Sequence, residues 1–252
     1  MRTVRRGTGT PLVLIHGHPV DHHLLMPLDE GIARHDRWER IYLDLPGYGA
    51  SEPVPSIDSA QALADHLVDE LRSMFGTTRF ALLGNSFGGM LARHVAAVMP
   101  EHVIGLGLLC PVAVADHARR QLPPRTVLVK DPDLLASLAD EDRSEYENMA
   151  VTQSPQNWER FRSAALPGLR NHDAEAVARI SANYSLDMEP EERRGGFDGP
   201  TLIITGRQDQ VVGFADQAQL LRHYPLLRSS TRPGTTRTWT SQRWLANSST
   251  IG

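Results

Sequence analysis

The stretch RFALLGNSFGGM (Arg79–Met90) decides the fold of this chain. Its first half, RFALLG, is a short apolar run, which is typical of a strand buried on both faces. The sequence that follows, MLARHVAAVMP, predicts a helix that ends at Pro100. Between them, Gly84–Gly88 has the pattern G-x-S-x-G, whose small residues allow a tight turn that exposes the Ser86 hydroxyl above the sheet. The stretch therefore predicts a nucleophilic serine on a strand-to-helix turn.

Backbone amides near this serine predict a site for a negative charge. The helix after Ser86 directs its first N–H groups and the positive end of its dipole toward the serine, which suits a developing oxyanion. HGHP (His16–Pro19) follows another buried-strand run, PLVLI, and in a hydrolase the loop at this place supplies the second oxyanion donor. Because Pro19 has no N–H, we expect the oxyanion hole to consist of the amides of His18 and Phe87.

An acidic residue follows a later strand. GRQDQVV (Gly206–Val212) comes directly after the buried run TLIIT, so Asp209 is expected at the same edge of a parallel sheet as Ser86. A lone aspartate at such a place is usually a turn residue. The order serine and then aspartate favours a second interpretation, in which Asp209 orients a histidine base.

Buried strands alternate with helices along most of the chain. RIYLDLPG (Arg40–Gly47) and VIGLGLLC (Val103–Cys110) are further buried-strand runs. This alternation predicts an α/β fold with a mostly parallel central sheet covered by helices on both faces. From Asp131 to about Ser185 only helical segments occur, which predicts an inserted all-helical cap. The expected division is a first core part at 1–111, a cap at 112–195, a second core part at 196–225 and an aberrant tail at 226–252.

Composition excludes several classes of function. The 252 residues carry a net charge of −4, which implies no general attraction to nucleic acid or to an anionic membrane. Cys110 is the only cysteine, so an internal disulfide is impossible, as expected in a reducing cytoplasm. The apolar run near the N-terminus is too short for a signal-peptide core or a membrane span. We therefore expect a soluble cytoplasmic protein that acts on a small molecule, and the composition does not determine its oligomeric state.

Four motifs together resemble a known family. HGHPVDHH, DLPGYGAS, LLGNSFGGM and TLIITGRQD occur in the order and at the spacings of the serine-hydrolase branch of the α/β-hydrolase superfamily, over about residues 2–225. The resemblance implies Ser86 as nucleophile, Asp209 as triad acid, the His18 and Phe87 amides as oxyanion hole, and no cofactor. Epoxide hydrolases and haloalkane dehalogenases have a similar His-Gly-x-Pro turn but carry aspartate at the elbow. Ser86 instead favours esters, lactones, amides or carbon–carbon bonds beside a carbonyl.

The end of the chain departs from this pattern. The segment His223–Gly252 contains no Asp or Glu and no histidine after His223, although the family carries a Gly-His motif there. His223 belongs to the predicted helix before the final strand, where it should not reach Ser86. We expect a poorly packed tail and very weak turnover, because loss of one triad member costs on the order of 10⁶ in kcat. A shifted reading frame starting near Pro225 is one explanation, since codon choices for Pro233–Thr236 permit Gly-His-Asn in that frame.

Two other interpretations stay open. The missing histidine is compatible with a non-catalytic binding protein on a hydrolase fold. His16, His18, Asp21 and His22 also form H-x-H-x-x-D-H, which is close to the H-x-H-x-D-H pattern of metallo-β-lactamase-type metallohydrolases. The extra residue would misplace the later ligands, and no second ligand cluster is evident in the sequence, so we expect no catalytic metal.

Overall fold

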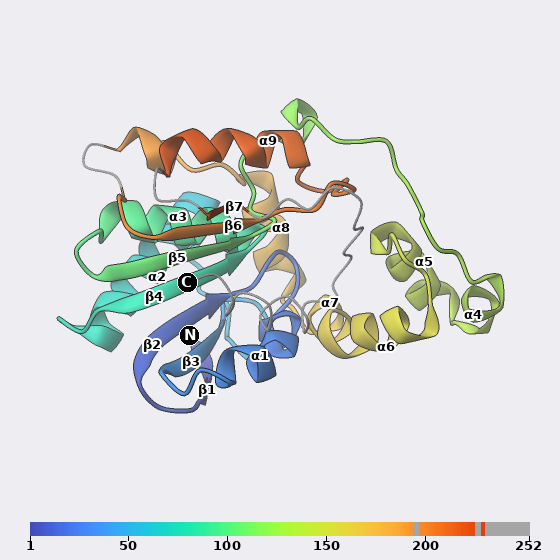
Figure 1. Ribbon diagram of the computed structural model, residues 1–252, viewed down its shortest axis with the longest axis horizontal. Helices are drawn as coiled ribbons and strands as arrows, with labels where there is room; N and C mark the ends of the chain where they lie inside the picture. Colours follow the sequence, from blue (N-terminus) through green and yellow to red (C-terminus); the bar gives the residue numbers. More distant parts are fainter. Residues whose placement is uncertain (194–196, 225–227, 230–252) are drawn as a thin grey trace.

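A mostly parallel β-sheet forms the centre of the molecule (Figure 1). The computed structural model describes residues 1–193, 197–224 and 228–229. Within these ranges a 7-stranded sheet has the order β1-β3-β2-β4-β5-β6-β7. Only β1 runs antiparallel to its neighbour, β3. The strands are β1 (Arg2–Arg6), β2 (Thr10–Ile15), β3 (Trp38–Asp44), β4 (Phe80–Asn85), β5 (Val103–Leu109), β6 (Thr201–Ile204) and β7 (Arg228–Ser229).

Helices cover both faces of the sheet, which explains the continuous apolar runs of its strands. In β2, Val13 and Ile15 share an apolar cluster with residues of α2 and α3. Leu12 and Leu14 of the same strand belong to a separate cluster with residues of η2 and α1. The predicted α/β fold is therefore confirmed. The elements beside the sheet are η1 (His22–Leu24), η2 (Met26–Leu28), α1 (Asp29–Ala33), α2 (Ala60–Phe75), α3 (Phe87–Val98), α9 (Phe214–Gln219) and η5 (Leu220–His223).

The chain between β5 and β6 is helical. Asp131 and Ser154 accept backbone N–H groups at the starts of α4 (Pro132–Ser137) and α6 (Pro155–Ala164), and proline follows each of them. Tyr146 and Trp158 lie in an apolar cluster within this segment, with ring centroids 5.2 Å apart. Figure 1 shows α4, α5 and α6 to one side of the sheet. The elements are η3 (His117–Arg119), α4 (Pro132–Ser137), α5 (Asp140–Met149), α6 (Pro155–Ala164), α7 (Leu166–Arg170), α8 (Ala174–Ala182) and η4 (Pro190–Glu192).

Most of the predicted aberrant tail, 226–252, lies outside the described residues. Its two described residues form β7, whose backbone pairs with Leu202 and Ile203 of β6.

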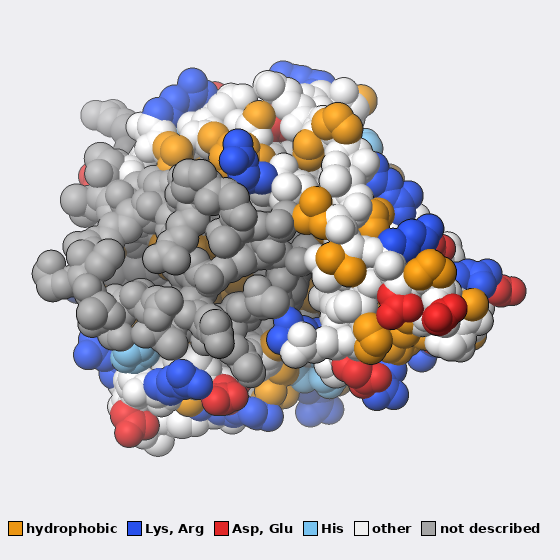
Figure 2. Space-filling model, turned by 45° about the vertical axis from the view of Figure 1, so that its right-hand side comes forward, with side chains coloured by type: hydrophobic (Ala, Val, Ile, Leu, Met, Phe, Trp, Pro, Cys, Tyr) orange, Lys and Arg blue, Asp and Glu red, His pale blue; other side chains and the backbone are white. Residues whose placement is uncertain are grey.

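On the face shown in Figure 2, basic and acidic side chains are interspersed. In the described part of the chain, no helix combines the length and the apolar character needed to cross a membrane.

Candidate active site

Ser86 occupies a strained turn between β4 and α3. Its backbone angles are φ 51° and ψ −115°, a region that favours glycine. The Ser86 amide donates to the Leu109 carbonyl at 3.0 Å, and the Ser86 carbonyl accepts from the Val112 amide at 2.9 Å. The end of β5 therefore holds this turn in place. The side chain is partly exposed, as a nucleophile at the carboxyl edge of the sheet requires.

The glycines around Ser86 are sterically required. A Cβ atom on Gly84 would lie 2.2 Å from the carbonyl oxygen of Gly88. A Cβ atom on Gly88 would lie 2.3 Å from the carbonyl oxygens of both Ile15 and His16. Because these contacts are with backbone, no side-chain movement can relieve them. They bring the start of α3 against the end of β2 and keep Ser86 close to the loop that follows β2.

That loop brings His18 beside the serine. A Cβ atom on Gly17 would lie 3.3 Å from the Cβ atom of Ser86, and the His18–Pro19 peptide bond is cis. No turn, loop or cap hydrogen bond in the described part of the chain uses the amide of His18 or of Phe87. The two amides that were predicted to form the oxyanion hole thus lie next to Ser86 and donate no such backbone hydrogen bond.

The imidazole of His18 joins the core to the helical segment. Its Nδ1 atom lies 2.6 Å from the Tyr48 hydroxyl, and its Nε2 atom lies 2.9 Å from the hydroxyl of Ser181 in α8. The rings of Phe87 and Tyr184 pack against it, with centroids 5.7 and 5.6 Å away. Burial lowers the pKa of His18 to about 4, so the ring is neutral at neutral pH. With both nitrogens held by hydroxyl groups, this ring is not placed to act as a base on Ser86.

Asp209 follows β6 and accepts hydrogen bonds from three nitrogen donors. Its Oδ1 atom accepts the amides of Val211 and Val212 at 3.0 Å each, and its Oδ2 atom accepts Nε2 of Gln217 at 3.0 Å. Gln217 lies fully buried on α9, and its Oε1 atom has no partner among the described residues. No sequence pattern indicates this contact, because the two residues belong to different elements.

Cys110 lies between the two predicted catalytic residues. It follows β5, and its amide donates to the carbonyl of Ile204 in β6 at 2.7 Å. Burial raises the pKa of its thiol, and a hydrogen bond to Asp209 raises it further. Since β4, β5 and β6 are adjacent and parallel, Ser86, Cys110 and Asp209 all follow the carboxyl ends of neighbouring strands. The thiol therefore stays protonated and is no nucleophile.

No histidine completes a triad in the described part of the chain. All 11 histidines lie there, and none is hydrogen-bonded to Ser86 or Asp209. His223 ends η5, where its Nε2 atom accepts Nε of Arg222 at 3.0 Å. The arrangement thus has a serine, two free amides and an acid, without a base.

The residues of the metallohydrolase pattern serve different purposes. Nε2 of His16 accepts the Leu45 amide at 3.1 Å and Nδ1 donates to the Gly17 carbonyl at 2.7 Å, so neither nitrogen is left for a metal. Burial lowers the pKa of His16, which keeps it neutral. Because the nitrogens of His18 are also engaged, the four-residue ligand set of His16, His18, Asp21 and His22 is not assembled.

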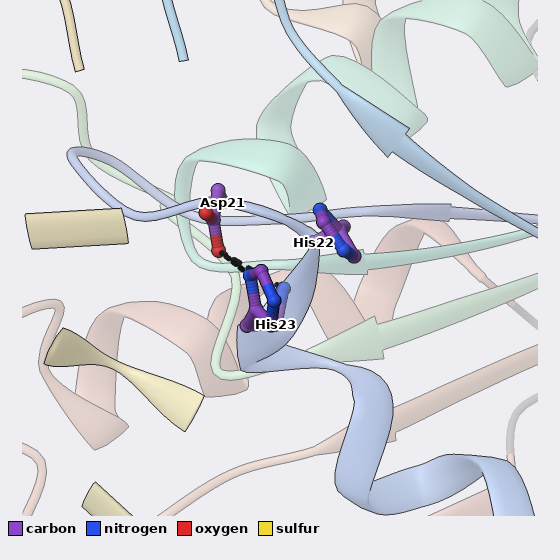
Figure 3. A group of neighbouring side chains, drawn as sticks. All are labelled: Asp21, His22 and His23. Atoms are coloured by element: carbon purple, nitrogen blue, oxygen red, sulfur yellow. Dashed lines mark hydrogen bonds and ion pairs between the residues drawn. The ribbon is translucent and has the colours of Figure 1, made fainter. Parts of the chain in front are cut away.

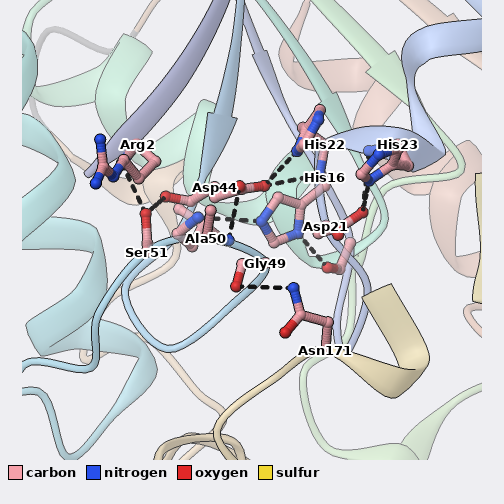
Figure 4. Close-up of polar contacts among 12 residues, drawn as sticks. Arg2, His16, Asp21, His22, His23, Asp44, Gly49, Ala50, Ser51 and Asn171 are labelled. Atoms are coloured by element: carbon pink, nitrogen blue, oxygen red, sulfur yellow. Dashed lines mark hydrogen bonds and ion pairs between the residues drawn. The ribbon is translucent and has the colours of Figure 1, made fainter. Parts of the chain in front are cut away.

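Asp21, His22 and His23 form a separate group on the next turn of the chain (Figure 3). The buried Asp44, at the end of β3, connects this group to the core (Figure 4). Its carboxylate accepts the backbone amide of His22 at 3.0 Å, Nδ1 of the same histidine at 2.8 Å and the Ala50 amide at 3.0 Å. Hydrogen bonds from His22 and Ala50 outweigh the effect of burial and lower the pKa of Asp44. The motif DLPGYGAS therefore supplies an anchor for the loop after His18.

Arg93 was missed by the sequence reasoning although its charge interrupts the apolar helix α3. It is fully buried, and its Nη1 atom donates to the Val112 carbonyl at 2.8 Å. Its Nε and Nη2 atoms donate to the carboxylate of Glu191 at 2.7 and 2.5 Å. Since the Val112 amide donates to Ser86, Arg93 supports the serine turn through one intervening residue.

Comparison with known proteins identifies the family to which the chain belongs. Residues 10–228 match the family model described as alpha/beta hydrolase fold, and the chain belongs to this family of hydrolases. It is 30% identical over 222 residues to a pimeloyl-(acyl-carrier protein) methyl ester esterase of Shewanella sp. (strain MR-7), covering 85% of the chain and 79% of that protein. A Shewanella oneidensis protein with the same name is 31% identical over 126 residues, which span 48% of the chain and 44% of that protein.

Other similar proteins include a hydrolase named for a different substrate and a solved structure. A 2-hydroxy-6-oxononadienedioate/2-hydroxy-6-oxononatrienedioate hydrolase of Cupriavidus pinatubonensis is 26% identical over 180 residues, covering 68% of the chain and 60% of that protein. Among solved structures, an alpha/beta superfamily hydrolase from Oenococcus oeni PSU-1 superposes with a TM-score of 0.79 at 28% identity. The superposition covers 89% of the chain and 84% of that protein.

Proposed function

We propose that the chain has the site of a serine hydrolase that cleaves a carboxylic ester of a small molecule. The observation that carries this proposal is the turn at Ser86, a partly exposed serine with φ 51° at the start of α3. A strained turn of this kind persists only where surrounding structure supports it, and it presents the hydroxyl to a substrate carbonyl.

In the proposed mechanism, Oγ of Ser86 attacks the carbonyl carbon and its proton passes to a base. The amides of His18 and Phe87 stabilise the oxyanion of the tetrahedral intermediate. Collapse of the intermediate expels the alcohol and leaves an acyl group on Ser86, which water then hydrolyses. Asp209 is the acid that would orient a histidine. This chain lacks that histidine, so we expect very weak turnover.

We further propose that residues 112–195 form a cap over Ser86. Two contacts support this: Ser181 of α8 reaches Nε2 of His18, and the ring of Tyr184 packs on Phe87 with centroids 4.8 Å apart. Both partners in the core are neighbours of Ser86. Substrate would then enter between the cap and the core. The named activities of the relatives favour esters first, and a carbon–carbon bond beside a carbonyl second.

Covalent labelling tests the nucleophile. A fluorophosphonate probe should label the chain slowly, and Ser86→Ala should abolish the labelling while leaving the circular dichroism spectrum unchanged. Labelling that persists in the variant would show that the nucleophile is misassigned.

Chemical rescue tests the missing base. Added imidazole should raise the hydrolysis of p-nitrophenyl acetate above the rate that imidazole produces with Ser86→Ala. A panel of p-nitrophenyl esters of rising chain length then defines the acyl group. If imidazole gives no Ser86-dependent rate, the alternative of a non-catalytic binding protein is favoured, because the missing histidine is then not the only defect.

A further inference from the structure

A group of potential metal ligands lies on the loop after Pro19. Asp21, His22 and His23 each offer one side-chain ligand atom, and these atoms all lie within 4.8 Å of one another. The two imidazole rings face one another, with centroids 4.1 Å apart and planes inclined by 34° (Figure 3). We propose that this group, the Asp21–His23 cluster, binds a divalent transition-metal ion such as Zn²⁺ or Ni²⁺, separately from the chemistry at Ser86.

The hydrogen bonds of His22 leave one ring nitrogen for a metal. Its Nδ1 atom lies 2.8 Å from Oδ1 of the buried Asp44 (Figure 4). Because an ionised carboxylate only accepts hydrogen bonds, Nδ1 carries the proton and Nε2 keeps its lone pair. Histidines that bind metals are commonly held in this way, by a carboxylate on the ring nitrogen that does not face the ion. In the part of the chain that the structure describes, Nε2 of His22 has no hydrogen-bond partner.

Asp21 and His23 supply the other two ligands. Oδ1 of Asp21 accepts the backbone amide and Nδ1 of His23, each at 3.0 Å, and no described residue donates to Oδ2. The side chain of Asp21 is 2% exposed and that of His23 is 44% exposed. The cluster therefore combines a fixed carboxylate with an imidazole that an ion can reach from solvent.

The backbone that carries the ligands is held from two sides. A Cβ atom on Gly168 would lie 2.3 Å from the Asp21 amide nitrogen, so α7 packs directly on the loop. From the other side, Asp44 accepts the His22 amide at 3.0 Å. Zinc lies about 2.0–2.2 Å from its ligands, which places two ligand atoms about 3–4 Å apart. The ligand atoms lie up to 4.8 Å apart, so the side chains must come closer together to bind the ion.

The types of ligand determine which ions bind. Two imidazoles and one carboxylate favour Zn²⁺, Ni²⁺ and Cu²⁺, whereas Mg²⁺ and Ca²⁺ prefer sites made of oxygen atoms alone. Three protein ligands leave a fourth position of a tetrahedral ion open to water. Because the ligand atoms must approach one another, we expect weaker binding than at a preformed zinc site.

Isothermal titration of the full chain without a histidine tag tests the proposal. ZnCl₂ and NiCl₂ should each show a single saturable site, and MgCl₂ should show none. His23→Ala removes a half-exposed ring and should weaken zinc binding at least about tenfold. Asp21→Asn keeps an oxygen for the His23 amide but loses the charge, and should weaken binding similarly. His102→Ala is the matched control, because His102 pairs with Glu101 at 2.9 Å outside the cluster.

Each result of the titration either supports or overturns the proposed metal site. Binding that is lost in His23→Ala and Asp21→Asn but kept in His102→Ala supports the site. No saturable binding, or equal binding by His23→Ala and the parent chain, overturns it. Circular dichroism shows whether each variant is folded. Since the proposal does not depend on the hydrolase assignment, EDTA should leave the labelling of Ser86 unchanged.

Discussion

At position 86 a serine adopts a backbone conformation that most side chains avoid, and its neighbours make this possible. Gly84 and Gly88 have no side chain where a Cβ atom would meet backbone oxygens at 2.2 and 2.3 Å. His18 shows a second effect at this scale, since burial lowers its pKa and keeps its ring neutral. Single residues thus set both the shape and the charge of the site.

Gly88→Ala should destabilise the protein by about 2–4 kcal/mol, because backbone must shift to admit the methyl group. The measurement is the free energy of unfolding in urea. Gly105→Ala in β5 is the control, since its nearest atom, the Pro200 carbonyl oxygen, lies 3.7 Å from the added Cβ. Equal losses in the two variants would contradict the steric argument.

The lowered pKa of His18 predicts that the free energy of unfolding depends on pH. Its pKa falls from 6.5 to about 4 on folding, so the unfolded chain binds this proton more tightly. The free energy of unfolding should therefore decrease as pH falls from about 6.5 to about 4, by on the order of 2–3 kcal/mol from this ring. Below that range the ring is protonated in both states and its contribution stays constant. Urea unfolding at several pH values should show a smaller decrease for His18→Gln; identical profiles would count against the assignment.

Among the elements, α3 connects the serine turn to the rest of the fold. Its first residue follows Ser86, and its Arg93 pairs with Glu191 of η4 and contacts the loop after β5 through Val112. Burial disfavours the charged guanidinium, but the bonds to Glu191 raise the pKa of Arg93. Tyr224 donates to the same glutamate at 2.5 Å. The helix that begins directly after Ser86 is therefore held by a buried ion pair.

Replacing Arg93 with methionine should lower the free energy of unfolding by about 3–5 kcal/mol, because Glu191 is left buried without its partner. The double variant Arg93→Met/Glu191→Leu should recover a large part of that loss. Arg143→Ala is the control, since Arg143 pairs with the exposed Asp140 and should cost at most about 1 kcal/mol. Additive losses in the double variant would show that the two charges do not act as a pair.

At the scale of the whole molecule, the sheet brings Ser86, Cys110 and Asp209 to one edge from segments far apart in the chain. The resemblance to serine hydrolases implies a histidine after the last of these segments, and this chain has none after His223. The proposed acid, Asp209, is thus held in place without the base that it would orient.

We expect the DNA to explain this. A frame shifted near Pro225 should encode Gly-His-Asn across the codons of Pro233–Thr236 and continue without an early stop. Sequencing the gene decides whether it does. A chain that carries the restored frame should hydrolyse p-nitrophenyl esters on the order of 10⁶ times faster than this chain. An early stop codon, or the absence of Gly-His codons, would rule out the frameshift. An inactive restored chain would show that the histidine is not the catalytic base.

Local pattern determined much of this protein. Continuous apolar runs identified the strands buried on both faces, and G-x-S-x-G between a strand and a helix identified the turn at Ser86. The order of motifs also placed Asp209 at the carboxyl edge of the sheet. These features could be predicted because each depends on residues close together in the sequence, whose periodicity and turn geometry carry the signal.

Only the tertiary structure decided which side chains meet. The contact of Arg93 with Glu191 joins residues 98 positions apart. Gln217 reaches Asp209 from another element. The histidines of one short motif divide between the core, the contact with Ser181 of α8 and the Asp21–His23 cluster. No local pattern encodes such pairs, because burial and the position of each partner are set by how the sheet and its helices pack.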